Sequence, residues 1–279
     1  MTPARWTELE AECLESLRAG EERPFERRGE VEDWFRFAFR FVLEAAREVR
    51  RHRMTAGFDG VAIKDDGSPA TRLETRIEET LRARLAAFDP GATVVGEETG
   101  GSLPERGRAI AIDPVDGTWA FLDGTETYAT TLILFRDGEP VLGVIANPST
   151  GEVGYAWRGE RTRLVRLSLL GEPDASDQLP APSHGGRSVR VNAHPSPGAA
   201  PLVAALQEAW RRGEIVVVRS PGGSPSWALL DAARGRYTYV NLWAGASTKP
   251  YDLTAGVLLV EGAGGRVVDV RGQPIDPLR

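Results

Sequence analysis

The amino-acid sequence predicts an α/β fold, with an α+β first half and an α/β second half. Two observations support this prediction: long helical patterns precede a group of short apolar strands, and strands alternate with helices beyond residue 188. Such alternation is typical of α/β architecture. The chain has 279 residues, of which 41% are hydrophobic and 27% charged, as in a globular protein of one large domain or two closely packed ones.

Helical patterns dominate the first ninety residues. Residues 1–30 are rich in charge and are interpreted as an N-terminal extension that carries a short helix. Apolar residues then recur at helical spacing in two longer segments. Thr71 is followed three residues later by Glu74, a pattern that predicts a capping box at the start of the third helix. The predicted helices are Trp6–Leu17, Val31–His52 and Arg72–Ala87.

Short apolar runs predict a sheet in the remainder of the first half. Asp137-Gly138 lies between two of these runs and predicts a hairpin turn. Residues 171–188 hold many Pro, Gly, Ser and Asp residues and predict a linker, so we expect halves of 31–180 and 181–279. The predicted strands are Thr93–Val95, Ala109–Ile112, Ala129–Phe135, Val141–Ala146, Val153–Trp157 and Leu164–Leu169.

The second half shows the alternating pattern. Strands are expected at Val189–Val191, Ile215–Val218, Tyr237–Val240 and Val267–Val270. Helices are expected between them, at Pro201–Arg212, Ser226–Arg234 and Asp252–Glu261.

Charge and composition exclude several classes of function. The net charge of −6 argues against a broad basic surface for nucleic acid. Cys13 is the only cysteine, so the chain cannot form an internal disulfide framework. No apolar run approaches 18 residues and no signal-peptide pattern opens the chain, so we expect a cytoplasmic protein without a membrane span.

Two aspartates three residues apart form the strongest local signal. Asp113 and Asp116 follow an apolar strand, Pro114 between them restricts the backbone, and Gly117 permits a tight turn. Such a turn can direct both carboxylates and the Val115 carbonyl toward one point, which is the all-oxygen environment that a hard divalent cation prefers. An isolated motif of this kind is more often a simple polar turn.

Two further acidic segments change that balance. Gly96-Glu97-Glu98 ends another apolar strand, and Asp252 precedes an apolar helix. Each has an ordinary explanation, as a solvated glutamate pair or as an N-cap. If the segments converge, Asp252 brings a carboxylate from the second half, and the helix N-terminus behind it favours a nearby phosphate.

Together these segments resemble the inositol monophosphatase superfamily. The resemblance rests on Gly96-Glu97-Glu98, on Asp113 to Thr118 and on Tyr251 to Gly256, in the family's order and approximate spacing. Gly223-Ser224 and the segment from Lys64 to Thr71 also match, and the resemblance covers roughly residues 58–276.

The resemblance implies a layered αβαβα sandwich with the active site between the halves. It implies two or three Mg²⁺ ions, held by Glu97, Asp113, the Val115 carbonyl, Asp116 and Asp252. Glu74 stands where the family often has an aspartate that contributes to the most weakly held ion. Glu97 and Thr118 would orient the attacking water, with Asp116 also counted as catalytic. Substrate contacts are implied for Asp116, Gly117, Thr118, Gly223, Ser224, Asn241 and Asp252.

The implied activity is hydrolysis of a small phosphate monoester, with inositol 1-phosphate or a related polyol or sugar phosphate as first candidate. Adenosine 3′,5′-bisphosphate and histidinol phosphate are alternatives within the family. The chain stops where the family usually continues with another strand and helix. This difference motivates an alternative of another class, a weakly active protein that binds ligands and acts through partners. Lithium sensitivity and a homodimer are further expectations from the family.

Overall fold

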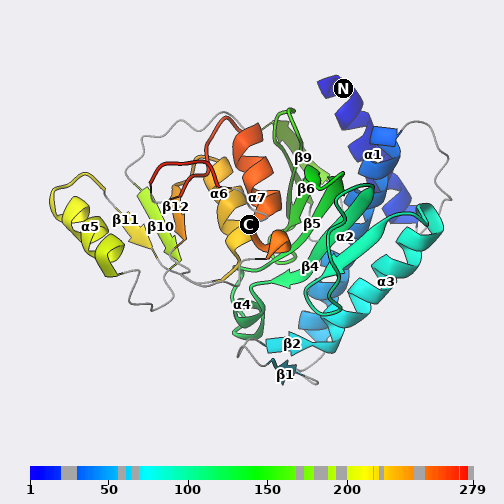
Figure 1. The fold of residues 1–279 in the computed structure, drawn as a ribbon, viewed down its shortest axis with the longest axis horizontal. Helices are drawn as coiled ribbons and strands as arrows, with labels where there is room; N and C mark the ends of the chain where they lie inside the picture. Colours follow the sequence, from blue (N-terminus) through cyan, green and yellow to red (C-terminus); the bar gives the residue numbers. More distant parts are fainter. Residues whose placement is uncertain are drawn as a thin grey trace.

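Helices and sheets alternate in five layers in the computed structural model of the chain (Figure 1). The structure describes residues 1–19, 30–55, 61–64, 69–167, 173–178, 188–192, 200–215, 217–219, 223–241, 249–269 and 271–275. The order of layers is helices, a seven-stranded sheet, helices, a three-stranded sheet and a final helix. This order confirms the predicted αβαβα sandwich.

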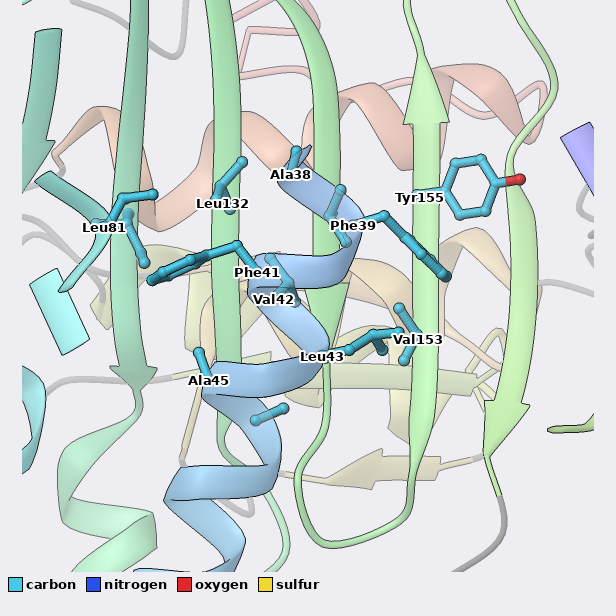
Figure 2. Packing of buried hydrophobic residues seen from close by; sticks show 14 of the residues in the cluster. Ala38, Phe39, Phe41, Val42, Leu43, Ala45, Leu81, Leu132, Val153 and Tyr155 are labelled. Atoms are coloured by element: carbon cyan, nitrogen blue, oxygen red, sulfur yellow. The ribbon is translucent and has the colours of Figure 1, made fainter. Parts of the chain in front are cut away.

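Three helices form the first layer: α1 (Pro3–Ala19), α2 (Glu30–Thr55) and α3 (Arg72–Phe88). The apolar residues of α2 pack on the central sheet and also on α1 and α3, and its charged residues lie on the remaining face. Figure 2 shows this packing, with Phe39 and Leu43 of α2 against Val153 and Tyr155 of the sheet. All three helices confirm the predicted helical segments.

The central sheet has the strand order β3-β4-β5-β6-β7-β8-β9. β3 runs parallel to β4, and every later neighbouring pair is antiparallel. The predicted hairpin at Asp137-Gly138 joins β5 to β6, with both residues at positive φ. The strands are β3 (Thr93–Gly96), β4 (Arg108–Asp116), β5 (Ala129–Arg136), β6 (Glu139–Ala146), β7 (Glu152–Trp157), β8 (Arg163–Leu167) and β9 (Pro173–Gln178).

Helices α6 (Pro225–Ala233) and α7 (Pro250–Gly262) cover the other face of this sheet. The approach is close, because a Cβ atom at Gly143 of β6 would lie only 2.8 Å from Ala255 Cα of α7. The second half of the chain therefore packs directly on the strands of the first half.

The outer layers are smaller. The parallel sheet β11-β10-β12 is formed by β10 (Ser188–Asn192), β11 (Val217–Arg219) and β12 (Thr238–Asn241). Helix α5 (Ala200–Arg211) contributes Leu202 and Leu206 to a small core on this sheet. A separate hairpin of β1 (Val61–Ile63) and β2 (Pro69–Thr71) precedes α3. In the described part of the chain, no helix is long and apolar enough to cross a membrane.

Two expectations for secondary structure were wrong. The segment 171–188 was expected to be a linker, but its residues Pro173–Gln178 form β9 and pair with β8. Backbone hydrogen bonds at the sheet edge suffice for this pairing, whatever the polarity of the side chains. The strand expected at Val267–Val270 is reduced to one bridge between Val268 and Pro274, and residues 179–187 and Val270 lie outside the described residues. The domain boundary near residue 180 stays a prediction.

Candidate active site

The end of β4 brings Asp113 and Asp116 together in the interior. The register between β4 and β5 shifts between these two residues, so the strand bulges where the carboxylates emerge. Asp113 Oδ1 accepts the Val115 N–H at 2.9 Å, and the Pro114 carbonyl accepts the Thr130 hydroxyl at 2.8 Å. The predicted tight turn is therefore present, and hydrogen bonds fix both sides of it.

Thr118 opens the short helix α4 (Thr118–Leu122), directly after Gly117. Its hydroxyl lies 3.1 Å from Glu74 Oε1 and 3.1 Å from the Val115 carbonyl. Glu74 is completely buried, and its Oε2 accepts the Thr71 N–H at 2.6 Å and the Thr71 hydroxyl at 2.7 Å. The predicted capping box is confirmed, and the same carboxylate also reaches Thr118.

Glu97 and Glu98 follow β3 and share one cation. Lys64 Nζ lies 2.7 Å from Glu97 Oε1 and 2.5 Å from Glu98 Oε1. Burial alone would lower the pKa of Lys64, but the hydrogen bonds and charges of the two glutamates outweigh burial and raise this pKa. Lys64 therefore stays protonated beside the predicted ligand Glu97.

The second half reaches the site through the start of α6. Asp116 Oδ2 accepts the Ser224 hydroxyl at 2.5 Å and the Ser226 N–H at 2.9 Å. Ser224 is also the N-cap of α6, because its side-chain oxygen accepts the Trp227 N–H at 2.8 Å. Predicted substrate contact Ser224 thus lies against predicted ligand Asp116.

Glycine is required where the two halves meet. Gly117 has φ of +87°, and a Cβ atom there would lie 2.7 Å from the Ser224 nitrogen. Gly223 has φ of +91°, and a Cβ atom there would overlap Thr127. Both positions combine left-handed backbone with backbone contact, which only glycine tolerates without strain. Gly117 and Gly223, both predicted site residues, therefore allow the halves to touch.

Asp252 approaches from the first turn of α7. It occupies the third helical position rather than the N-cap, and its Oδ2 accepts the Lys249 N–H at 2.7 Å. The Ser226 hydroxyl donates to the Asp252 carbonyl at 2.8 Å, so the starts of α6 and α7 are joined. Asn241 ends β12, and its side chain lies outside the described side chains.

The buried acids raise one another's pKa values. Burial raises the pKa of Asp113 well above its usual range, and the negative charges of Glu97, Asp116, Glu74 and Asp252 raise it further. Burial, partly opposed by hydrogen bonds, also raises the pKa of Asp116 to about 6, of Asp252 to about 7 and of Glu74 to about 8. The negative charges of five acids, which come from α3, the loop after β3, the end of β4 and the start of α7, are therefore concentrated around Asp113.

The oxygen atoms of these five acids are the type of ligand that a hard divalent cation prefers. In the described part of the chain, no group of three or more His, Cys, Asp or Glu side chains is arranged to hold a metal ion as it stands. The carboxylates are instead hydrogen-bonded to Thr71, Ser224, Lys249 and Lys64. However, oxygen donors that repel one another in a buried region are what Mg²⁺ stabilises, since its charge offsets the repulsion.

Sequence reasoning missed Glu78 of α3, which is also completely buried. Glu78 accepts the N–H groups of Glu98 and Thr99, directly after Glu97. Its signal was available in the sequence, because residues four apart share a helix face and Glu78 stands four residues after Glu74.

Comparisons with known proteins agree with this geometry. The model of the inositol monophosphatase family matches residues 30–279. Histidinol-phosphatase of Mycobacterium tuberculosis is 30% identical over 238 residues, which cover 83% of this chain and 85% of that protein. The chloroplastic bifunctional phosphatase IMPL2 of Arabidopsis thaliana is 29% identical over 234 residues, which cover 83% of this chain but only 63% of that longer protein.

A solved structure gives the same result for the fold. The IMPase of Thermotoga maritima superimposes with a TM-score of 0.72 at 19% identity, covering 88% of this chain and 89% of that one. Helix α1 precedes the residues that the family model matches. The chain belongs to the inositol monophosphatase family, whose members are phosphoric monoester hydrolases.

Proposed function

We propose that this chain hydrolyses a small phosphate monoester with the help of bound Mg²⁺. The observation that carries the proposal is the position of Asp113, a buried carboxylate in the field of four other acids. Such a cluster destabilises the fold unless a cation compensates it, and a site for Mg²⁺ explains why the acids are gathered there.

Glu97, Asp113, the Val115 carbonyl, Asp116 and Asp252 would hold two ions, with Glu74 supporting a third and weaker one. Bound Mg²⁺ would supply the positive charge that lowers the pKa of water and stabilises the leaving oxygen. Phosphate monoesters hydrolyse extremely slowly without such help.

The remaining residues would orient the reactants. Thr118 and Glu97 are proposed to hold the attacking water, and the contact between Thr118 and Glu74 supports a fixed hydroxyl. The N–H groups of Gly117 and Thr118 would donate to phosphate oxygens. Gly223 and Asn241 are proposed to contact the alcohol part of the substrate. Ser224 is completely buried and donates to Asp116, so it would instead hold that carboxylate in place.

Two substrates lead the candidates. Histidinol phosphate is supported by the 30% identical relative from Mycobacterium tuberculosis, and inositol 1-phosphate by the family itself. We place histidinol phosphate first, since that relative covers most of both chains. A homodimer and inhibition by Li⁺ also belong to this proposal, as family properties.

The test is phosphate release from a panel of histidinol, inositol, sugar and nucleotide phosphates, with Mg²⁺, with Mg²⁺ plus Li⁺, and with EDTA. Asp113→Asn and Asp116→Asn should each reduce turnover at least roughly 100-fold, since a ligand is lost. Asp137→Asn is the matched control, because Asp137 is exposed in the β5–β6 turn and asparagine tolerates its positive φ. Full activity in EDTA, or in either of the first two variants, would refute the proposal.

A further inference from the structure

A polar stripe runs along α3 beside its apolar stripe. Glu74, Glu78 and Arg82 stand four residues apart and therefore lie on one face of the helix. Glu74 contacts Thr118, as described above. The other two residues contact the loop that follows β3, which carries Glu97.

Glu78 binds this loop through an unusual set of contacts for a buried carboxylate. Its Oε1 accepts the Glu98 N–H at 2.9 Å, and its Oε2 accepts the Thr99 N–H at 2.8 Å and the Thr99 hydroxyl at 2.5 Å. The residue has no solvent exposure. A buried charge is tolerated only when it is fully hydrogen-bonded, and here all three donors come from two consecutive loop residues.

The loop is shaped to receive this carboxylate. A Cβ atom at Gly96 would overlap the Glu78 carboxylate, so the loop backbone lies directly on it. Gly96 and Gly100 exchange both backbone hydrogen bonds at 3.0 Å, which closes the loop. Arg82 donates to the Val94 carbonyl at 3.0 Å and to the Gly100 carbonyl at 2.8 Å, and so holds both sides.

Glu97 lies between the two points at which Glu78 meets the loop. Gly96 before it packs on the carboxylate, and the N–H of Glu98 after it donates to the carboxylate. The backbone of Glu97 therefore has little freedom, and its side chain emerges on the side of Lys64.

We propose that Glu78 is a positioning residue: by binding the loop residues before and after Glu97, it fixes the Glu97 backbone so that the Glu97 side chain can bind Mg²⁺. This role rests on the proposed function of Glu97 as a ligand. Residues that orient metal ligands commonly change metal affinity or activity by roughly 10–100-fold when altered. Glu78 is not itself expected to contact substrate or metal.

The principal test compares Glu78→Gln with Glu79→Gln. Both remove a negative charge from adjacent positions of α3, but Glu79 is exposed. The three loop donors bind both carboxylate oxygens of Glu78, but glutamine has only one side-chain oxygen. At least one donor therefore loses its acceptor in Glu78→Gln. In the metal-free protein, amide exchange at Glu98 and Thr99 should become roughly tenfold faster in Glu78→Gln, which corresponds to the loss of one hydrogen bond to a charged group.

Mg²⁺ binding is measured on the same proteins by titration calorimetry, alongside phosphate release. Glu78→Gln should weaken Mg²⁺ binding roughly 10-fold or more, and Glu79→Gln should match wild type in both measurements. Either unchanged amide exchange or Mg²⁺ binding within twofold of wild type in folded Glu78→Gln would overturn the proposal.

A second variant covers the case in which Glu78→Gln does not fold. Thr99→Val removes the hydroxyl bond to Glu78 and the two bonds that this hydroxyl accepts from Arg82, at 3.2 Å and 2.6 Å. Both N–H bonds to Glu78 and the bonds of Arg82 to the Val94 and Gly100 carbonyls remain, so the fold should survive. It should weaken Mg²⁺ binding severalfold, and wild-type binding would overturn the proposal. If wild type neither binds Mg²⁺ nor releases phosphate, the proposed function fails instead, and amide exchange alone decides whether Glu78 fixes the loop.

Discussion

A buried ion pair between Glu10 and Arg163 anchors helix α1 to the central sheet. Removing this ion pair tests how much it contributes to the free energy of unfolding. The Glu10 side chain is 3% exposed and that of Arg163, on β8, is 5% exposed. Arg163 Nε donates to Glu10 Oε1 at 2.8 Å, and the Tyr155 hydroxyl donates to the same oxygen at 2.5 Å. Burial and the adjacent Glu10 charge raise the pKa of Tyr155, so its hydroxyl remains a donor.

We expect Glu10→Gln to destabilise the protein by about 3–5 kcal/mol, the usual cost of leaving one partner of a buried ion pair without its counter-charge. Glutamine keeps the size of the side chain, so little of this cost comes from a cavity. At about 2–4 °C per kcal/mol for a chain of this size, the thermal midpoint should fall by about 10 °C.

The assay is urea unfolding of wild type, Glu10→Gln and the double variant Glu10→Met with Arg163→Met. The double variant should recover part of the loss, because it buries no unpaired charge but removes the acceptor of the buried Tyr155 hydroxyl. Glu208→Gln is the control, since its partner Arg211 is 74% exposed and such surface pairs contribute at most about 1 kcal/mol. A loss below about 1 kcal/mol in Glu10→Gln would refute the anchoring role.

Two other outcomes follow from the structure. In Mg²⁺ titrations of activity, Glu74→Asp should lower the half-saturating Mg²⁺ concentration and Glu74→Gln should raise it; three superimposable curves would leave the capping box as the whole role of Glu74. Burial would by itself raise the pKa of Glu152, but Arg166 and Arg234 outweigh it and hold this pKa below its usual range. Because the folded-state pKa is lowered, the stabilisation is present above the unfolded value of about 4.3 and is lost as the pH falls through the folded value. Unfolding measured between pH 7 and pH 2 should therefore show a weaker acid dependence in Glu152→Gln, and identical curves would contradict the assignment.

The sequence predicted most helices and strands because their apolar residues repeat at the spacing of the element. α2, α3 and the β5–β6 hairpin are examples, with one clear stripe, one capping box and one turn signal. β9 was missed because no periodic pattern marks it, and its strand structure comes from pairing with β8. A polar edge strand of this kind is determined by its neighbour rather than by its own residues.

The acidic residues of the candidate site were predicted from local motifs, but their surroundings were not. No residue near Asp116 in the sequence predicts that its hydrogen-bond partners are Ser224 and Ser226. Only the packing of α6 on the sheet places these serines beside Asp116. Glu78 was overlooked for a related reason, since a glutamate on a helix is ordinarily a surface residue. Its burial depends on the loop after β3.

The contact between Asp116 and Ser224 spans 108 positions of the chain. During synthesis, the segment that carries Asp113 and Asp116 leaves the ribosome well before the starts of α6 and α7 exist. The order of translation therefore makes the cluster of acids one of the last parts to be completed, because such distant contacts form only after both partners have emerged. A nascent chain that ends before Asp252 would expose the partly built acidic site and the face of the sheet that α7 later covers together.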